Sequence, residues 1–282
     1  MITPENFSEN FNNENFKEIY NQTFEQFKAN ISEEKFVELS TIFHREANDL
    51  SMKYNNTLKV NFHRYSYMND KKTHFLIVAF TDKNDIVGIE FHLNHKYDTD
   101  NIWTKNEYYV PLEEAVVSAG GIGIFHNYHY QSDNQRYAYD FTNMIELYQH
   151  NGAPADLEAY FAYGSDVLAP LDGTVVEVKK DLLDNSIGTV NSEEPSGNYI
   201  IIEHDNHEYS LLAHLKRNSV KVKPGDKVKA KEVIAQVGNS GATTLPHLHF
   251  QIMSGKELNK DSIRIRFKNH ETLTQGDRIE EL

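Results

Sequence analysis

The chain has 282 residues, a length typical of two domains, and its 39% hydrophobic and 25% charged residues are ordinary for a globular protein. Its formal net charge of −14 argues against nucleic-acid binding, because phosphate contacts need clustered Lys and Arg, and against electrostatic docking on anionic membranes. The absence of cysteine excludes disulfides, thiolate metal ligands and cysteine nucleophiles, so any metal site must use His, Asp or Glu.

The first part of the chain has the periodicity of helices. Apolar residues recur every three or four positions from Asn15 to Ile31, which predicts an amphipathic helix. Ser32 precedes two glutamates and is typical of a helix N-cap. We expect this second helix to end near Leu50 and to bury a stripe made of Phe36, Leu39, Ile42 and Phe43.

Three β-rich runs follow, Leu58–Tyr65, Thr73–Thr81 and Ile86–Leu93. Turn-like segments at residues 68–71 and 82–85 separate them, which predicts an antiparallel meander. Two helices packed on this meander would form an α+β accessory domain.

A polar stretch from Asn94 to Asn106 predicts a boundary, with the accessory domain at residues 1–103 and a second domain at residues 104–282. The second domain has short alternating strands and glycine-containing turns, which predict a mostly antiparallel β fold. The irregular segment Asp181–Ser196, with a counterpart near Leu147–Ala162, is expected to shape a cleft.

Five histidines could carry chemistry. In His247-Leu248-His249 a strand would place both imidazoles on one face, and Pro246 restrains the backbone just before them. His214 ends another strand-like run. We interpret the other histidines, apart from two discussed next, as surface or hydrogen-bonded core residues: His44, His63, His74, His92, His95, His150, His204, His207 and His270.

Asp140 lies in the aromatic run Tyr137–Phe141, where burial is costly unless the carboxylate is paired or binds a metal. His126 and His129 lie upstream of it. Two imidazoles and one carboxylate would suffice for a zinc ion with a water in the fourth position, and two imidazoles would remain for proton transfer. The residues therefore indicate a metallohydrolase.

Several ordered motifs extend this interpretation. They are Val167–Pro170, Asp172–Val175, Gly197–His204, Leu212–Leu215, Val222–Val228, Gly238–Gly241 and Pro246–Phe250. Across residues 125–253 the chain thereby resembles the lysostaphin/LytM-type zinc metallopeptidases, which hydrolyse peptide stems or cross-links of bacterial peptidoglycan. The resemblance implies an antiparallel β core with an open groove above one zinc ion per chain.

By position, the resemblance implies that His129, Asp140 and His249 are the zinc ligands and that His214 and His247 are the catalytic imidazoles. In many members the first His lies four residues before the Asp, but this chain has Arg136 there. His129 precedes Asp140 by eleven residues and His126 by fourteen, so His129 is preferred and His126 stays open. Asn127 is interpreted as an ordinary loop residue, with a place behind the metal ligands as the alternative.

The N-terminal part loosely resembles small α+β domains related to the nuclear-transport-factor-two fold, and it could bind wall glycan, dimerise or gate the groove. A catalytically silent wall-binding or regulatory module is the alternative to an active enzyme. Another protein, or a competitor's wall, is an alternative substrate. We expect a secreted or cell-envelope protein without a transmembrane segment, since no apolar run is long enough to span a bilayer. The polar start Met1–Glu5 indicates that a signal peptide is absent from this chain.

Overall fold

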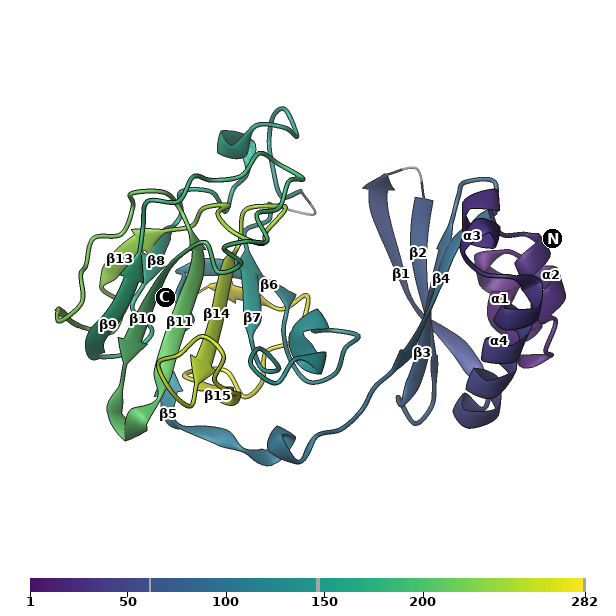
Figure 1. Ribbon diagram of the computed structural model, residues 1–282, viewed down its shortest axis with the longest axis horizontal. Coiled ribbons are helices and arrows are strands. Elements are labelled where there is room, and N and C mark those ends of the chain that lie inside the picture. The colour runs from purple at the N-terminus through teal and green to yellow at the C-terminus, as the bar shows by residue number, and fades with distance from the viewer. Residues whose placement is uncertain (61, 146–147, 281–282) are drawn as a thin grey trace. The chain divides into compact units, whose positions relative to one another are not determined.

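A computed structural model describes residues 1–60, 62–145 and 148–280, with the side chains of residues 53–60 and 62 left aside. The chain divides into two compact units, Met1–His95 and Lys96–Leu282 (Figure 1). Residues 96–103 thus group with the second unit, whereas the sequence placed the boundary between residues 103 and 104. That functional division stays a prediction, as does the resemblance of the first unit to the nuclear-transport-factor-two fold.

The first unit is a four-stranded antiparallel sheet with helices packed against one of its faces (Figure 1). The strands follow one another in the order β1-β2-β3-β4. The elements are α1 (Pro4–Asn12), α2 (Phe16–Asn21), α3 (Glu25–Asn30), α4 (Glu33–Ala47), β1 (Leu50–Val60), β2 (Phe62–Asn69), β3 (His74–Phe80) and β4 (Ile86–Leu93).

The single helix expected over residues 15–31 is two short helices, α2 and α3. The backbone between them pairs with β4, since Phe24 donates to the carbonyl of Ile86 at 2.9 Å and Ile86 donates to that of Gln22 at 3.1 Å. These tertiary hydrogen bonds replace helical ones, and apolar periodicity does not report them. Helix α1 was not predicted; it buries Phe7 and Phe11.

Helix α4 begins after Ser32 as predicted, and the Ser32 hydroxyl accepts from the backbone of Lys35 at 3.3 Å. The predicted buried stripe is partly wrong, because Leu39 and Ile42 are 38% and 40% exposed. The buried face instead repeats at intervals of four, three and four residues. Its members are Phe36, Ser40, Phe43 and Ala47.

The sheet has four strands rather than the three predicted. Strand β1 was missed because its sequence, LSMKYNNTLKV, is largely polar in the middle. The predicted run Leu58–Tyr65 covers the end of β1 and the start of β2, with residue 61 outside the described residues. The strands predicted at Thr73–Thr81 and Ile86–Leu93 are confirmed as β3 and β4.

The second unit is mostly antiparallel β, as predicted. Its larger sheet follows the order β12-β9-β10-β11-β14-β7-β6-β16, with β15 joining β14 to β5, and β8 pairs with β13. The β5–β15 pair is parallel. The strands are β5 (Trp103–Tyr108), β6 (Glu114–Ala119), β7 (Tyr139–Thr142), β8 (Asp166–Leu168), β9 (Gly173–Lys179), β10 (Asn198–Glu203), β11 (Tyr209–Leu215), β12 (Lys227–Val228), β13 (Val233–Gln236), β14 (Leu248–Met253), β15 (Ser262–Phe267) and β16 (Arg278–Glu280).

The main core of this unit lies against one face of the sheet, where Leu212, Leu248 and Phe250 are fully buried. A smaller cluster with Leu211 and Met253 lies against the other face. Side chains alternate along a strand, so His249 lies on the same face as Met253. The site is therefore built on the side of the sheet opposite the main core.

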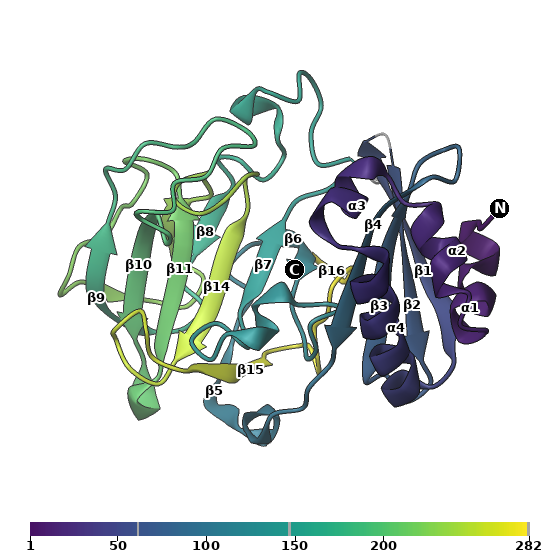
Figure 2. The same cartoon turned by 45° about the vertical axis from the view of Figure 1, so that its right-hand side comes forward.

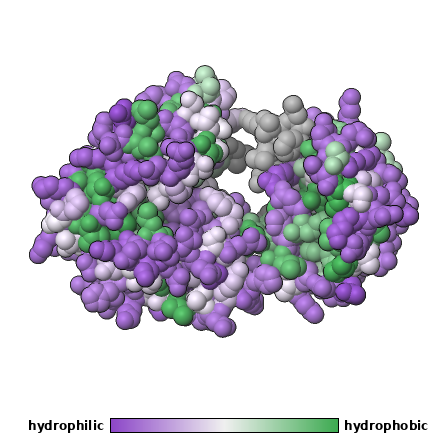
Figure 3. All heavy atoms as spheres, viewed as in Figure 1, coloured by the Kyte–Doolittle hydropathy of each residue, from purple (hydrophilic) through white to green (hydrophobic). Residues whose placement is uncertain are grey.

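No helix among the described residues is long and apolar enough to cross a membrane. In the view of Figure 3, hydrophilic residues make up most of the visible surface of the second unit, and hydrophobic residues form small groups within it.

The aromatic core of the first unit gives a stability prediction. Phe36 is fully buried against the rings of Tyr20, Phe27 and Phe91, so Phe36→Ala should lower the free energy of unfolding by about 3–5 kcal/mol. Leu39→Ala, on the exposed side of α4, should cost less than about 1 kcal/mol. Urea unfolding, followed by the helical circular dichroism signal, measures the stability of both variants. Equal losses of stability would contradict the assignment of Phe36 to the buried face of α4 and of Leu39 to the exposed face.

Candidate metal centre

Three neighbouring strands, β11, β14 and β7, form the floor of the site (Figure 2). In the antiparallel pairing of β14 with β7, His249 lies directly opposite Asp140. Directly opposed residues bring their side chains into contact range on one face of the sheet. Ala213 is the partner of His249 on β11, so the next residue, His214, lies at the same end of the sheet.

His129 comes from a short 3-10 turn, Tyr128–Gln131, outside the sheet. Asn127 caps this turn, and its side-chain oxygen accepts from the backbone of His129 at 3.0 Å. The Asn127 amide donates to the carbonyls of Arg136 and Ala138 at 3.1 and 3.2 Å, just before β7. Asn127 is fully buried and ties the His129 turn to the Asp140 strand, so interpreting it as an ordinary loop residue was wrong.

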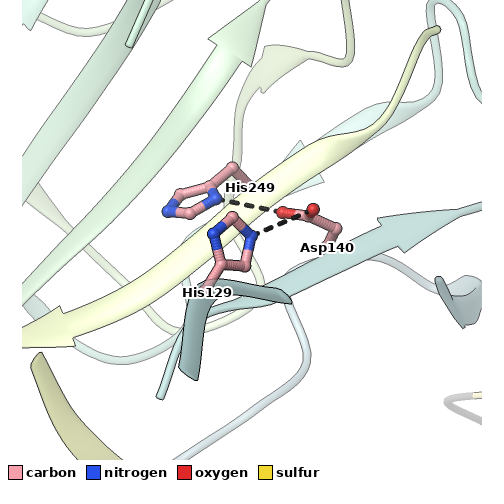
Figure 4. Close-up of side chains that lie close together, drawn as sticks. All are labelled: His129, Asp140 and His249. Atoms are coloured by element: carbon pink, nitrogen blue, oxygen red, sulfur yellow. Dashed lines mark hydrogen bonds and ion pairs between the residues drawn. The ribbon is translucent and has the colours of Figure 1, made fainter. Parts of the chain in front are cut away.

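His129, Asp140 and His249 converge, with one potential ligand atom from each lying within 4.8 Å of the others (Figure 4). His129 Nε2 lies 3.1 Å from Asp140 Oδ2, and His249 Nδ1 lies 3.0 Å from Asp140 Oδ1. All three side chains are buried. His129, rather than His126, supplies the first histidine of this cluster.

The outward nitrogens of both histidines face glutamine oxygens. His129 Nδ1 lies 2.9 Å from Gln135 Oε1, and His249 Nε2 lies 3.0 Å from Gln251 Oε1. An amide oxygen only accepts, so these outward nitrogens carry the protons. The inward nitrogens, His129 Nε2 and His249 Nδ1, then face the carboxylate, so a proton or a metal cation has to lie between each of them and its oxygen.

The charge of the cluster agrees with this requirement. Burial on its own would raise the pKa of Asp140, but the adjacent imidazoles of His247 and His129 hold that pKa well below its usual value. The carboxylate is therefore ionised at neutral pH in a buried position. Two imidazole nitrogens and one carboxylate form a donor set that suits zinc and leaves room for further ligands.

His214 and His247 lie beside the cluster. Their ring centroids are 4.8 Å apart, and the centroid of the His214 ring is 5.8 Å from that of the His249 ring. His214 Nδ1 donates to the carbonyl of Ser240 at 2.9 Å, and His247 Nδ1 donates to that of Leu245 at 2.9 Å. Each Nε2 is thereby left as a proton acceptor.

The Nε2 atom of His247 is buried and has no hydrogen-bond partner among the described residues. It lies 3.7 Å from Asp140 Oδ1. A buried polar atom without a partner is rare in proteins, and here it faces the Asp140 carboxylate. The position fits a group that is to bind a water or substrate atom.

His214 has a left-handed backbone conformation with a φ of 61°. Such strain persists where the surroundings fix it and is typical of functional sites. Its N–H donates to the carbonyl of Ser196 and its own carbonyl accepts from Gly238, both at 3.1 Å. Burial and the imidazoles of His247 and His249 hold the pKa of His214 well below its usual value, so this ring is neutral at neutral pH.

A close backbone approach positions the acceptor of His214. Gly197 has a φ of 62°, and a Cβ atom there would lie 2.1 Å from the carbonyl oxygen of Ser240. That carbonyl is the one that accepts from His214 Nδ1. Gly197 therefore lets the Ser240 carbonyl lie where it can accept from His214, and so helps to orient the His214 ring.

The irregular segment at residues 181–196 packs against the loop that leads to His247. The side chain of Asn185 donates to the carbonyl of Gly241 at 2.7 Å, and Gly188 donates from its backbone to that of Thr244 at 2.9 Å. Part of its expected counterpart, at residues 146 and 147, lies outside the described residues. The role of both segments in shaping a cleft stays a prediction.

The sequence analysis missed three side chains of the cluster. Tyr128 donates to Asp140 Oδ2, and Gln135 and Gln251 hold the outward nitrogens of the histidines. The sequence could have indicated Gln251, because it lies two residues after His249 on a strand and so on the same face. No sequence pattern indicates Gln135, since only the folded turn brings it to His129.

Comparison with known proteins supplies independent support. Residues 149–262 match the model of Peptidase family M23. This segment contains His214, His247 and His249, each in the geometry described above. Over these residues the C-terminal unit is similar to peptidase family M23. The match begins after His129 and Asp140, so the assignment of these two to the M23 site depends on the fold.

Two M23-like relatives illustrate the similarity. The chain is 35% identical over 99 residues to the glycyl-glycine endopeptidase ALE-1 of Staphylococcus capitis, covering 35% of this chain and 24% of that protein. It is 30% identical over 90 residues to the peptidoglycan DD-endopeptidase ShyC of Vibrio cholerae, covering 32% of this chain and 19% of that protein. The chain thus spans about a quarter or less of the length of these relatives.

Among solved structures, the catalytic domain of lysostaphin from Staphylococcus simulans aligns with a TM-score of 0.30 and 22% identity. The alignment covers 58% of this chain and 89% of that domain.

The geometry discriminates between the two candidate first ligands. His129→Ala should weaken zinc binding by at least about 100-fold, because it removes a ligand rather than an outer contact, while His126→Ala should leave the affinity unchanged. Competition with a chromophoric chelator measures both. A loss of zinc in the His126 variant, with the His129 variant unaffected, would reverse the assignment.

Proposed function

We propose that this protein is a zinc-dependent endopeptidase that hydrolyses peptide stems or cross-links of bacterial peptidoglycan. The observation that carries the proposal is the convergence of five side chains from four segments of the chain. One zinc ion per chain would be held by His129 Nε2, the Asp140 carboxylate and His249 Nδ1. His214 and His247 would then supply proton-transfer groups beside it.

When bound, zinc supplies Lewis acidity, which polarises a peptide carbonyl and lowers the pKa of a water molecule. The side chains of the protein supply the proton transfer. The Nε2 atoms of His214 and His247 accept hydrogen bonds and can take the proton of the attacking water. Once protonated, an imidazole can donate to the oxyanion that develops and return the proton to the leaving amine.

Carbonyl acceptors prepare both rings for this role. Because Ser240 and Leu245 hold the Nδ1–H groups, neither imidazole needs to reorient before accepting a proton at Nε2. The low pKa of His214 keeps that ring unprotonated at neutral pH.

The substrate class comes from the relatives. ALE-1 is named for glycyl-glycine bonds and ShyC for peptidoglycan, so a wall peptide is the substrate we propose. A secreted or cell-envelope location follows from that substrate. A catalytically silent wall-binding module is the less favoured alternative, because the chain has all five proposed residues and their side chains lie close together.

Substitutions should separate metal binding from proton transfer. His249→Ala should lose zinc and all hydrolysis. His214→Ala and His247→Ala should keep zinc and lower the rate by about 100- to 10,000-fold, the usual contribution of general acid–base catalysis. Digestion of defined muropeptides with mass analysis measures the rate and names the bond, and zinc content is measured in parallel.

Full hydrolysis by the His249 variant would refute the assignment. A zinc-loaded wild-type protein that binds wall fragments but cleaves none would favour the silent module.

A further inference from the structure

The long spacing between the first two proposed ligands leaves room for a turn between them. His129 precedes Asp140 by eleven residues, and the ten residues between them include a tight turn at residues 132–136. We propose that this turn and Gln251 form a clamp that holds the outward nitrogens of both histidine ligands. The clamp is defined as the side chains of Gln135 and Gln251 with the backbone carbonyl of Asn134. It rests on the proposed zinc site.

The first arm of the clamp acts on His129. Gln135 Oε1 accepts from His129 Nδ1 at 2.9 Å, which directs Nε2 toward Asp140. The backbone of Gln135 is fixed on both sides. Its N–H donates to the carbonyl of Ser132 at 2.9 Å, and its carbonyl accepts from Ala138 at 2.8 Å.

The second arm acts on His249 from two residues further along the same strand, β14. Gln251 Oε1 accepts from His249 Nε2 at 3.0 Å, which directs Nδ1 toward Asp140. The other end of the same amide donates to the carbonyl of Asn134 at 3.0 Å. The amide is therefore oriented by the turn, and its oxygen has to face the histidine. Gln251 is 1% exposed, so water does not compete for these contacts.

Arg136 anchors the turn. Its guanidinium lies 3.4 Å from the centre of the Tyr97 ring, its Nε donates to the carbonyl of Tyr130 at 3.1 Å, and it pairs with Asp133. The backbone of Ser262 also donates to the carbonyl of Asp133 at 3.1 Å. Arg136 lies four residues before Asp140, where many members of the family have the first His ligand. In this chain its contacts stabilise the turn instead.

One small turn thus connects the two histidine ligands, which come from a loop and from the centre of a sheet. Outer partners fix the tautomer and ring orientation of metal-bound histidines, and their loss weakens metal binding about 10- to 100-fold. Both acceptors here are neutral amides, so the clamp orients the rings without adding negative charge. Gln135 and Gln251 are positioning residues, because they act through His129 and His249.

Zinc affinity tests the clamp. Gln135→Met and Gln251→Met keep the side-chain length but remove the acceptor, and each should weaken zinc binding about 10- to 100-fold. Gln135→Glu keeps an acceptor for His129 Nδ1 and should bind zinc at least as tightly as the wild type. Gln236→Met, on β13, is the matched control and should leave the affinity unchanged. Competition with a chromophoric chelator gives the affinities, and circular dichroism confirms folding.

A spectroscopic measurement reports the hydrogen bonds directly. In the zinc-loaded wild type, nitrogen-15 NMR should show slowly exchanging Nδ1–H of His129 and Nε2–H of His249, and each signal should exchange faster in the matching Met variant. Wild-type affinity in both Met variants would overturn the clamp and leave the zinc site intact, and so would a Gln135→Glu variant as weak as Gln135→Met. A wild type that binds no zinc would overturn the proposed function itself.

Discussion

The pairing of β14 with β7 is the constraint on which the site depends. Because His249 lies opposite Asp140 in an antiparallel ladder, the two side chains meet whatever the surrounding loops do. A shift of the register by one residue would turn one of them to the other face of the sheet. The fully buried Leu248 and Phe250 oppose such a shift, since it would move their side chains out of the main core.

The other three histidines of the site, His129, His214 and His247, are held next to this pair by hydrogen bonds to neighbouring loops. Asn127 fixes the His129 turn to the backbone just before Asp140, and Ser240 and Leu245 fix the rings of His214 and His247. Each imidazole in the group of four has one nitrogen committed to a protein oxygen and the other turned toward the site. The M23 match covers residues 149–262. His129 and Asp140 lie before the matched residues, and the fold brings their side chains next to His249.

The sequence predicted the cluster of candidate site residues better than it predicted the helices. The strand alternation places His247 and His249 on one face, whereas the roles of His129, Asp140 and His214 were assigned from the resemblance to a family. Helix limits depended on tertiary contacts that leave no periodic signal, such as the pairing of residues 22–24 with Ile86. Strand β1 was missed because its apolar pattern is weak, and Ser40 faces the core in place of Leu39 because helix geometry, not hydrophobicity, decides which residues share a face.

The central claim is that one cation is held by His129, Asp140 and His249. Anomalous diffraction at the zinc edge, from crystals of the zinc-loaded protein, tests it most directly. The account predicts one strong peak at about 2.0–2.2 Å from His129 Nε2, an Asp140 oxygen and His249 Nδ1. A peak coordinated by His126, or one away from Asp140 and His249, would contradict it.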